Sequence, residues 1–452
     1  MCIRDSVIGD GSLSGGEAYE GLSNAGEMGT NLIIVVNDNE MSIAENHGGL
    51  YQNLKELRDT EGRSSCNFFR SLGLDYLYVG EGNDIPSLIA AFAKVKDTSR
   101  PTVVHIHTQK GKGYAPAEAD REEFHWEMPF DLETGKPKVD CSGMEDYHSL
   151  TGKFLLEKMK EDHTVVAISS GTPTVIGFTP ERRKQAGRQF VDVGIAEEHA
   201  VALASGIAAG GGRPVYGVYS TFIQRCYDQL SQDLCINGNP AVITVFMGTV
   251  AGMNDVTHLG FFDIPLISNI PNMVYLAPTC SEEYFAMLEW AVRQTEYPVA
   301  IRVPGAAVVH RKEEFDTDYS ELNRYKMTAR GETVAILALG AFYDLGQALK
   351  NKLREESGVE ATLINPRYIT GLDEPMLEEL KVGHRIVVTL EDGVLDGGFG
   401  EKIARYYGNS EMRVLNYGLR KEFADRYNLD ELMKANRLTD KQMAEDIAGI
   451  LE

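Results

Sequence analysis

The chain has 452 residues, with 44 lysines and arginines against 67 aspartates and glutamates, which gives a formal net charge of −23. This negative charge argues against non-specific binding to nucleic acid or to an anionic membrane surface. The length favours two or three domains. No apolar run is long enough to cross a bilayer and no secretory signal is visible, so we expect a cytoplasmic protein.

The N-terminus indicates that the chain is truncated. Val7 and Ile8 are typical of the end of a buried strand, whereas residues 1–6, MCIRDS, carry charges where that strand should continue. We therefore expect the first domain to lack its upstream part, and weak or absent activity from the chain as it stands. The six cysteines show no CxxC spacing, which favours free thiols in a reducing compartment over a zinc site or a disulfide framework.

Short β-rich runs alternate with helical patterns along the whole chain. This alternation predicts an α/β fold of three doubly wound parallel-sheet domains, the first incomplete, whose ligands gather at the carboxyl ends of the strands. The predicted strands are residues 32–38, 102–108, 164–169, 241–246, 333–339 and 385–391. The predicted domains are residues 1–110, 146–307 and 325–452, with a long linker over residues 111–145.

Two polar motifs follow neighbouring predicted strands near the N-terminus. Asp10 lies in a GDG turn after one strand, and Asn39 follows the next strand in NDNEMS. A carboxylate, an amide oxygen and the carbonyl of Met41 would be hard ligands suited to Mg²⁺. Gly11 would let the backbone approach a diphosphate closely. Each motif alone is more often a tight turn or a helix cap, but the pair in this order is far more specific.

The stretches GDGSLSGGEAYEGLSNAG and NDNEMSIAEN resemble the 1-deoxy-D-xylulose-5-phosphate synthases, which belong to the transketolase group of thiamine-diphosphate enzymes. The likeness extends over essentially the whole chain from Val7. It implies a thiamine-diphosphate-binding fold with thiamine diphosphate and Mg²⁺ as cofactors. It also implies that Asp10, Asn39 and Met41 hold the metal, and that Ile43 lies under the thiazolium ring.

Glu197, in FVDVGIAEEHA, follows an apolar strand and begins a helix of small residues. Such an environment would raise the pKa of the carboxyl group and let it share a proton with a ring nitrogen. The alternative is an acid that complements a helix dipole. The resemblance implies that Glu197 engages the aminopyrimidine of the cofactor and that Phe222, in YSTF, stacks on the same ring.

Other positions match residues that handle substrate and cofactor. By resemblance, Lys110 lies at a strand end near the cofactor, and His125 and His258 are catalytic. Arg302, at another strand end, could favour an anionic substrate because a guanidinium suits phosphate. The same match places two more residues at the substrate, Tyr219 and Arg225.

The chain departs from the family pattern in the loop expected to bind the acceptor substrate. The arginine expected to grip a phosphate is Met247, and the expected aspartate falls on Asn254, with Asp255 beside it. A family GHD reads as residues 82–84, GND. Losing a charge-assisted phosphate contact costs about 1.5–3 kcal/mol unless another cation, for which Arg302 and Arg225 are candidates, compensates.

The third predicted domain contains a glycine run, Gly397, Gly398 and Gly400, after a strand. Such a run is weak support for a nucleotide loop. It favours close packing of a strand on a helix, and the resemblance implies a domain that supports a homodimer rather than catalysis.

The predicted function is condensation of pyruvate with glyceraldehyde 3-phosphate to 1-deoxy-D-xylulose 5-phosphate with loss of CO₂, in the synthesis of isoprenoid and thiamine precursors. The predicted partners are these small-molecule substrates, and we expect no nucleic-acid or membrane partner. Two alternatives remain open. One is a related thiamine-dependent transferase with a different acceptor, such as a non-phosphorylated one, and the other is a catalytically silent fragment or subunit.

Overall fold

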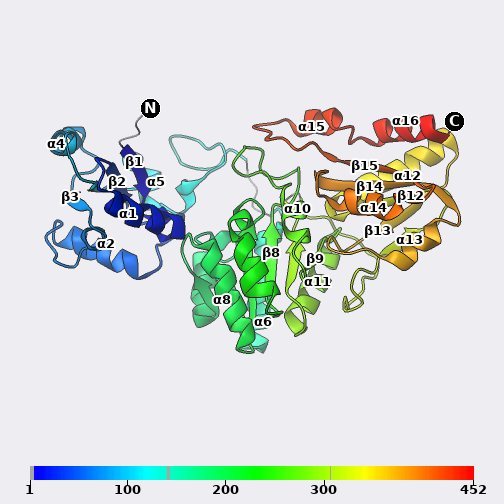
Figure 1. Ribbon diagram of the computed structural model, residues 1–452, viewed down its shortest axis with the longest axis horizontal. Helices are drawn as coiled ribbons and strands as arrows, with labels where there is room; N and C mark the ends of the chain where they lie inside the picture. Colours follow the sequence, from blue (N-terminus) through cyan, green and yellow to red (C-terminus); the bar gives the residue numbers. More distant parts are fainter. Residues whose placement is uncertain (1–4, 140–142, 306, 452) are drawn as a thin grey trace. The chain divides into compact units, whose positions relative to one another are not determined.

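The computed structural model describes residues 5–139, 143–305 and 307–451, whose strands form three sheets (Figure 1). The chain falls into two compact units. The first holds the residues up to 144 together with 169–173 and 192–199, and the second holds the remainder, so the second and third predicted domains lie in one unit. We describe each unit by itself.

The first sheet has the order β1-β2-β4-β3, with all neighbours parallel. Ile34 and Val36 of β2 pack into one apolar cluster with α1, α2 and α3, whereas Val35 packs with α4. This alternation follows from the two-residue period of a strand and covers both faces of the sheet. The elements are β1 (Asp5–Gly9), η1 (Gly11–Ser14), α1 (Gly16–Met28), β2 (Ile33–Asp38), α2 (Gly49–Asp59), α3 (Phe68–Ser71), β3 (Asp75–Val79), α4 (Ile85–Val95) and β4 (Thr102–His107).

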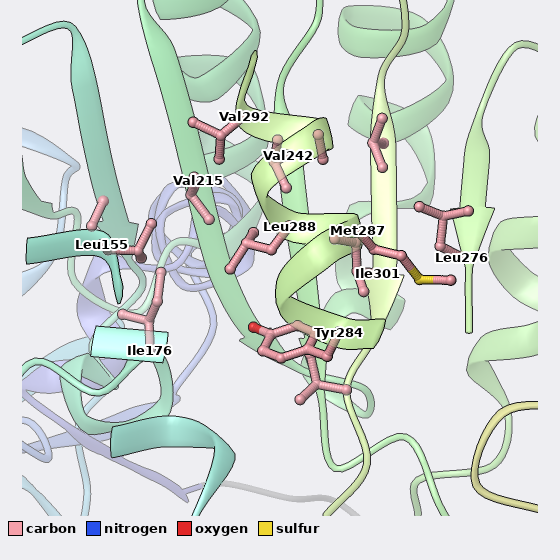
Figure 2. Close-up of a cluster of buried hydrophobic side chains, with 14 of the residues drawn as sticks. Leu155, Ile176, Val215, Val242, Leu276, Tyr284, Met287, Leu288, Val292 and Ile301 are labelled. Carbon is pink, nitrogen blue, oxygen red and sulfur yellow. The ribbon is translucent and has the colours of Figure 1, made fainter. Parts of the chain in front are cut away.

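The second sheet has the order β6-β5-β7-β8-β10-β9, and its recorded strand pairs are parallel. Figure 2 shows its core, where Leu155, Val215, Val242, Leu288 and Ile301 are buried in one cluster. The elements are α6 (Tyr147–Glu161), β5 (Val165–Ser169), α7 (Pro180–Ala186), β6 (Phe190–Asp192), α8 (Glu197–Ala209), β7 (Arg213–Tyr219), η5 (Phe222–Cys226), β8 (Val242–Phe246), α10 (Asp263–Ser268), β9 (Val274–Leu276), α11 (Ser281–Arg293) and β10 (Val299–Arg302).

The third sheet has the order β11-β13-β12-β14-β15 and is mixed, because the edge strand β11 runs antiparallel to β13. The other pairs are parallel. The elements are β11 (Lys326–Ala329), β12 (Thr333–Ala338), α12 (Tyr343–Ser357), β13 (Thr362–Asn365), α13 (Glu374–Leu380), β14 (His384–Val394), α14 (Phe399–Tyr407), β15 (Arg413–Leu419), α15 (Leu429–Ala435) and α16 (Asp440–Leu451).

The glycine run before α14 serves packing. A Cβ on Gly400 would lie 2.5 Å from the hydroxyl of Thr389, so the helix approaches the sheet too closely for a side chain there. The carboxylate of Glu391 accepts hydrogen bonds from the N–H groups of Phe399, at 2.8 Å, and Gly400, at 2.7 Å. A side chain of the protein itself therefore fills the helix N-terminus that a nucleotide phosphate would need.

The six predicted strands correspond to β2, β4, β5, β8, β12 and β14, with boundaries within one residue except that β14 continues to Val394. The predicted linker is more ordered than expected. It contains a short helix, α5 (Ala115–Ala119), and the rings of Tyr114, Phe124 and Phe130 pack together. In the described residues, no helix is both long and apolar enough to span a membrane.

Candidate active site

Asp10 lies at the carboxyl end of β1 and is 1% exposed. Its N–H donates to the carbonyl of Asn37 at 3.0 Å, which ties the GDG turn to the end of β2. Its carboxylate accepts hydrogen bonds from the backbone N–H groups of Gly11 and Asn39 and, at 2.7 Å, from the amide of Asn46. The structure thus brings Asp10 and Asn39 together at neighbouring strand ends.

The Asp10 carboxyl group is electrostatically disfavoured in its charged form. Burial, followed by the nearby charge of Asp38, raises the pKa of Asp10 to about 6, although the hydrogen bonds from Asn46 and the backbone oppose this shift. A cation placed against this carboxylate would remove that cost, because opposite charges stabilise the ionised form.

The surroundings of Asp10 fit a hard cation. Two buried oxygens beside it, Asn46 Oδ1 and Ser42 Oγ, find no hydrogen-bond partner among the described residues. No group of three or more His, Cys, Asp or Glu side chains in the described ranges could hold a metal. An ion at Asp10 would therefore rely on amide and carbonyl oxygens, which Asn39 and Met41 provide and which Mg²⁺ accepts.

Two residues that sequence reasoning missed support this turn. Asn46 donates to the Asp10 carboxylate, and the hydroxyl of Tyr51, on α2, donates to the carbonyls of Asp10 and Gly11 at 3.1 Å each. A Cβ on Gly11 would lie 2.9 Å from the Cβ of Ser42, so this position requires glycine. The close approach of the two loops is the physical reason for the second glycine of the GDG motif.

Lys110 and His125 lie near the loop that carries Ile43. The ammonium of Lys110 donates to the carbonyl of Ser42 at 2.7 Å and to that of Ile43 at 3.3 Å. Partial burial lowers the pKa of Lys110, and the charge of Asp10 opposes this shift. Partial burial and the charge of Lys110 lower the pKa of His125. Lys110 therefore anchors the Ile43 loop.

Glu197 is the first residue of α8 and is 3% exposed. Residues 192–199 belong to the same compact unit as Asp10. The assignment of Glu197 to the pyrimidine ring remains a prediction. Its burial at a helix start is compatible with either of the two interpretations of the sequence.

In the second unit, three predicted residues form an aromatic group. Tyr219 ends β7 and Phe222 begins η5, and their ring centroids lie 5.5 Å apart. The Phe222 ring lies 5.5 Å from the imidazole of His258. Arg225 is exposed on the same short 3₁₀ turn.

Asp255 orients His258. Its carboxylate accepts from the hydroxyl of Thr257, at 2.5 Å, and lies 3.1 Å from Nδ1 of His258. The hydrogen bond from Thr257, helped by the one from His258, lowers the pKa of Asp255 to about 2, although burial opposes this shift. Asp255 therefore contacts the predicted catalytic histidine directly.

The structure corrects the predicted substrate role of Arg302. Arg302 is 3% exposed, and its guanidinium is held by two buried carboxylates, those of Asp263 and Asp392. Nε donates to Asp263 at 2.7 Å, and Nη2 also donates to the carbonyl of Gly260 at 3.1 Å. With every guanidinium nitrogen engaged and the side chain buried, Arg302 cannot compensate for a missing phosphate contact.

The predicted substrate role of Asn254 remains a prediction. Its amide donates to the carbonyl of Tyr427 at 3.0 Å, and its own carbonyl accepts from the N–H of Arg426 at 2.6 Å. Asn254 thus binds a segment of the C-terminal sequence. Met247 has a positive φ of 58°, and a Cβ on Gly305 would lie 2.4 Å from its sulfur, so the thioether packs on the Gly305 backbone.

The family GHD position serves local structure. Asp84 caps α4, and its carboxylate accepts from the N–H of Ser87 at 2.9 Å. The side-chain oxygen of Asn83 accepts from the N–H of Gln109 at 2.8 Å. Both side chains are explained by these hydrogen bonds.

Three protein-family models match the chain. They are "1-deoxy-D-xylulose-5-phosphate synthase" over residues 4–67, "Transketolase, pyrimidine binding domain" over residues 145–308 and "Transketolase, C-terminal domain" over residues 324–443. Among solved structures, the chain resembles a transketolase from Pichia stipitis in complex with sedoheptulose 7-phosphate, with a TM-score of 0.57 and 15% identity, over 98% of this chain and 75% of that chain. It also resembles a split-gene transketolase, described as an inactive β4 tetramer, with a TM-score of 0.56 and 21% identity, over 67% of this chain and 96% of that chain.

These matches define the protein as a transferase of the transketolase-like class, with the parallel-sheet α/β fold of thiamine-diphosphate enzymes. Among curated proteins, it is 34% identical to a 1-deoxy-D-xylulose-5-phosphate synthase of Lachnoclostridium phytofermentans, over 96% of this chain and 76% of the relative. It is also 34% identical to 1-deoxy-D-xylulose-5-phosphate synthase 1 of Geobacter sulfurreducens, over 93% of this chain and 72% of the relative. The chain belongs to the 1-deoxy-D-xylulose-5-phosphate synthase family, which is thiamine-diphosphate dependent.

Proposed function

We propose that the chain catalyses the condensation of pyruvate with glyceraldehyde 3-phosphate to 1-deoxy-D-xylulose 5-phosphate with release of CO₂, for the synthesis of isoprenoid and thiamine precursors. The buried Asp10 carboxylate carries this proposal, because it lies against Asn39 and beside two buried oxygens that lack partners. The curated relatives share one activity in their names, which favours neither a different acceptor nor a silent subunit.

In this proposal, Mg²⁺ is held by the Asp10 carboxylate, the Asn39 amide oxygen and the Met41 carbonyl. Thiamine diphosphate supplies the electron sink for decarboxylation and carbon–carbon bond formation. Gly11 lets backbone approach the diphosphate, and the loop of Ile43, anchored by Lys110 through two carbonyls, supports the thiazolium ring.

The remaining roles are proposed as follows. Glu197 holds a proton at the pyrimidine ring, and Phe222 stacks on that ring. His258 transfers protons to and from the substrate, with its imidazole oriented by the Asp255 carboxylate at 3.1 Å. His125 is a second proton-transfer group, and Tyr219 and Arg225 contact the substrate.

We further propose that the protein is a homodimer and acts in the cytoplasm. The match of residues 324–443 to a transketolase C-terminal domain supports the dimer, because the resemblance gives that domain this role. The four cysteines in the described ranges, including the exposed Cys66, are free thiols, which favours a reducing compartment.

The binding of the cofactors tests this function. Calorimetric titration of the purified chain with thiamine diphosphate and Mg²⁺ should show saturable binding, and Asp10→Ala should weaken it at least about tenfold. Affinity that survives Asp10→Ala unchanged would rule out the metal site.

The chemistry is tested with carboxyl-labelled pyruvate. Glu197→Gln should abolish the release of labelled CO₂ while leaving metal binding intact, because the proposed role of Glu197 is proton transfer at the ring. Glu198→Gln is the matched control, since it makes the same chemical change one residue further along α8 and should retain activity. Release of labelled CO₂ by Glu197→Gln at the rate shown by Glu198→Gln contradicts the role of Glu197.

A further inference from the structure

A chain of buried polar groups lies behind the turn that carries Asn39. The carboxylate of Asp38, at the end of β2, accepts a hydrogen bond from Arg58 on α2 and lies 2.9 Å from Nε2 of His105 on β4. The hydroxyl of Tyr76, on β3, lies 2.6 Å from Nδ1 of the same imidazole. Asp38 and His105 are both 0% exposed. Three elements of the first unit, β2, α2 and β4, therefore meet at one carboxylate, and β3 joins them through the imidazole of His105.

These hydrogen-bonded polar side chains lie in a hydrophobic layer. Asp38 shares a strand face with Val36, and His105 shares one with Val103, and both valines belong to the cluster under α2 and α3. A buried ion pair in such a layer is weak support for stability, because desolvation cancels much of the attraction and apolar residues of similar size pack as well. The use of a carboxylate here therefore points to a role in geometry.

The carboxylate of Asp38 is joined directly to the proposed metal site. While Oδ2 faces Arg58 and His105, Oδ1 accepts from the N–H of Glu40 at 3.1 Å. Between those two residues lies Asn39, whose N–H donates to Asp10. The Asp38 side chain thus closes the turn around Asn39 from inside the sheet.

The other side of the turn has a second, exposed contact of the same kind. Nε2 of His107 lies 2.9 Å from the carboxylate of Glu40, and Arg58 reaches that carboxylate at 3.6 Å. His105 and His107 are two residues apart on β4 and pair with Asp38 and Glu40, which are two residues apart beside it. The turn is therefore held at both of its corners, and Asn39 lies between them.

We propose that Asp38, His105 and Tyr76 are positioning residues for the metal site. Their hydrogen bonds hold the turn from Asp38 to Met41, so that the amide oxygen of Asn39 meets the ion bound by Asp10. Tyr76 acts through the imidazole by directing Nε2–H toward Asp38. This inference rests on the proposed function, because it assigns these residues to the same metal.

The test measures Mn²⁺ affinity by electron paramagnetic resonance, with thiamine diphosphate present, in the full chain. Tyr76→Phe removes the hydroxyl that contacts the His105 imidazole and should raise the Kd for Mn²⁺ several-fold. His105→Phe should raise it about 10- to 100-fold, because losing a hydrogen-bond partner of a metal-binding group typically costs that much affinity. Tyr78→Phe is the matched control. Tyr78 also lies on β3 and contacts the same imidazole through its ring, at 5.3 Å between centroids, so its Kd should stay within about twofold of the parent.

A purely structural role makes a different prediction. If Tyr76 only stabilised the fold, Tyr76→Phe would lower the midpoint of thermal unfolding without changing the Kd of the folded protein for Mn²⁺. That result would overturn the proposal. Equal Kd values for Tyr76→Phe and Tyr78→Phe overturn it as well. If Asp10→Ala raises the Kd while His105→Phe does not, only this inference fails, whereas a parent chain that binds no Mn²⁺ removes the proposed function and this inference together.

Discussion

Arg302 lies between two buried carboxylates, and its guanidinium donates to both Asp263 and Asp392. Tyr275 adds a further hydrogen bond to Asp263. Three charged groups without solvent are tolerated only because each is paired and hydrogen-bonded. The chemistry that suits arginine to a phosphate here serves two carboxylates of the protein itself.

Removal of this arginine should be severely destabilising. Arg302→Met leaves two buried carboxylates without a cation, and we expect the free energy of unfolding to fall by about 3–5 kcal/mol. Urea denaturation measures the loss. Arg330→Met is the control, because the pair that Arg330 forms with Glu379 is 71% and 51% exposed and should be worth about 0–1 kcal/mol. Similar losses in the two variants would contradict the structural role of Arg302.

The helix α14 begins on a carboxylate that is costly to ionise. Burial raises the pKa of Glu391 to about 7, and the hydrogen bonds from Gly400 and Phe399, with the charges of Arg302 and Lys402, reduce the shift without cancelling it. Because the folded state binds this proton more tightly than the unfolded state, Glu391 contributes a loss of stability as pH rises from about 4.5 to about 7.

This linkage is testable by substitution. Glu391→Gln cannot ionise, so its free energy of unfolding should fall less between pH 5 and 7 than that of the parent, by up to about 1.4 kcal/mol per unit of pH. Guanidinium denaturation at three pH values measures the slope. Glu401→Gln, at an exposed residue in the first turn of the same helix, should retain the slope of the parent. Parallel slopes for Glu391→Gln and the parent would show that Glu391 does not titrate in this range.

Strands were predictable because an apolar run between turn residues is a local signal, as for β2 and β8. The meeting of Asp10 and Asn39 was predictable because carboxyl ends of neighbouring parallel strands share an edge. The partners of Arg302 were not predictable from the sequence, because Asp263 and Asp392 lie 39 and 90 residues away from it. Asn46 was missed for the same reason, being 36 residues from Asp10.

Each of the two compact units has its own apolar clusters and, among the described residues, its own tryptophan. Trp126, in the first unit, is 67% exposed, whereas Trp290, in the second, is 7% exposed and belongs to the core under α11. A buried indole changes its emission when its core opens, and an exposed one changes little. Tryptophan fluorescence should therefore report the unfolding of the second unit, whereas far-UV circular dichroism should report the unfolding of both units.

We expect the two signals to give different urea transitions. The apolar clusters of the first sheet are smaller than those of the second and third sheets, so circular dichroism should begin to change at lower urea than fluorescence does. Trp126→Phe should leave the fluorescence transition in place, which checks that Trp290 is the reporter. Superimposable curves would show that the whole chain unfolds in a single step.

The buried cluster of Arg302, Asp263 and Asp392 also limits how this protein can be recombined with its relatives. Asp263 and Arg302 come from the region of the second sheet, and Asp392 comes from β14 of the third. A chimera that takes its last segment from another parent would inherit the arginine from one gene and its second counter-ion from the other. Shuffled libraries should therefore retain fully folded members only where the incoming segment also carries an acid at position 392.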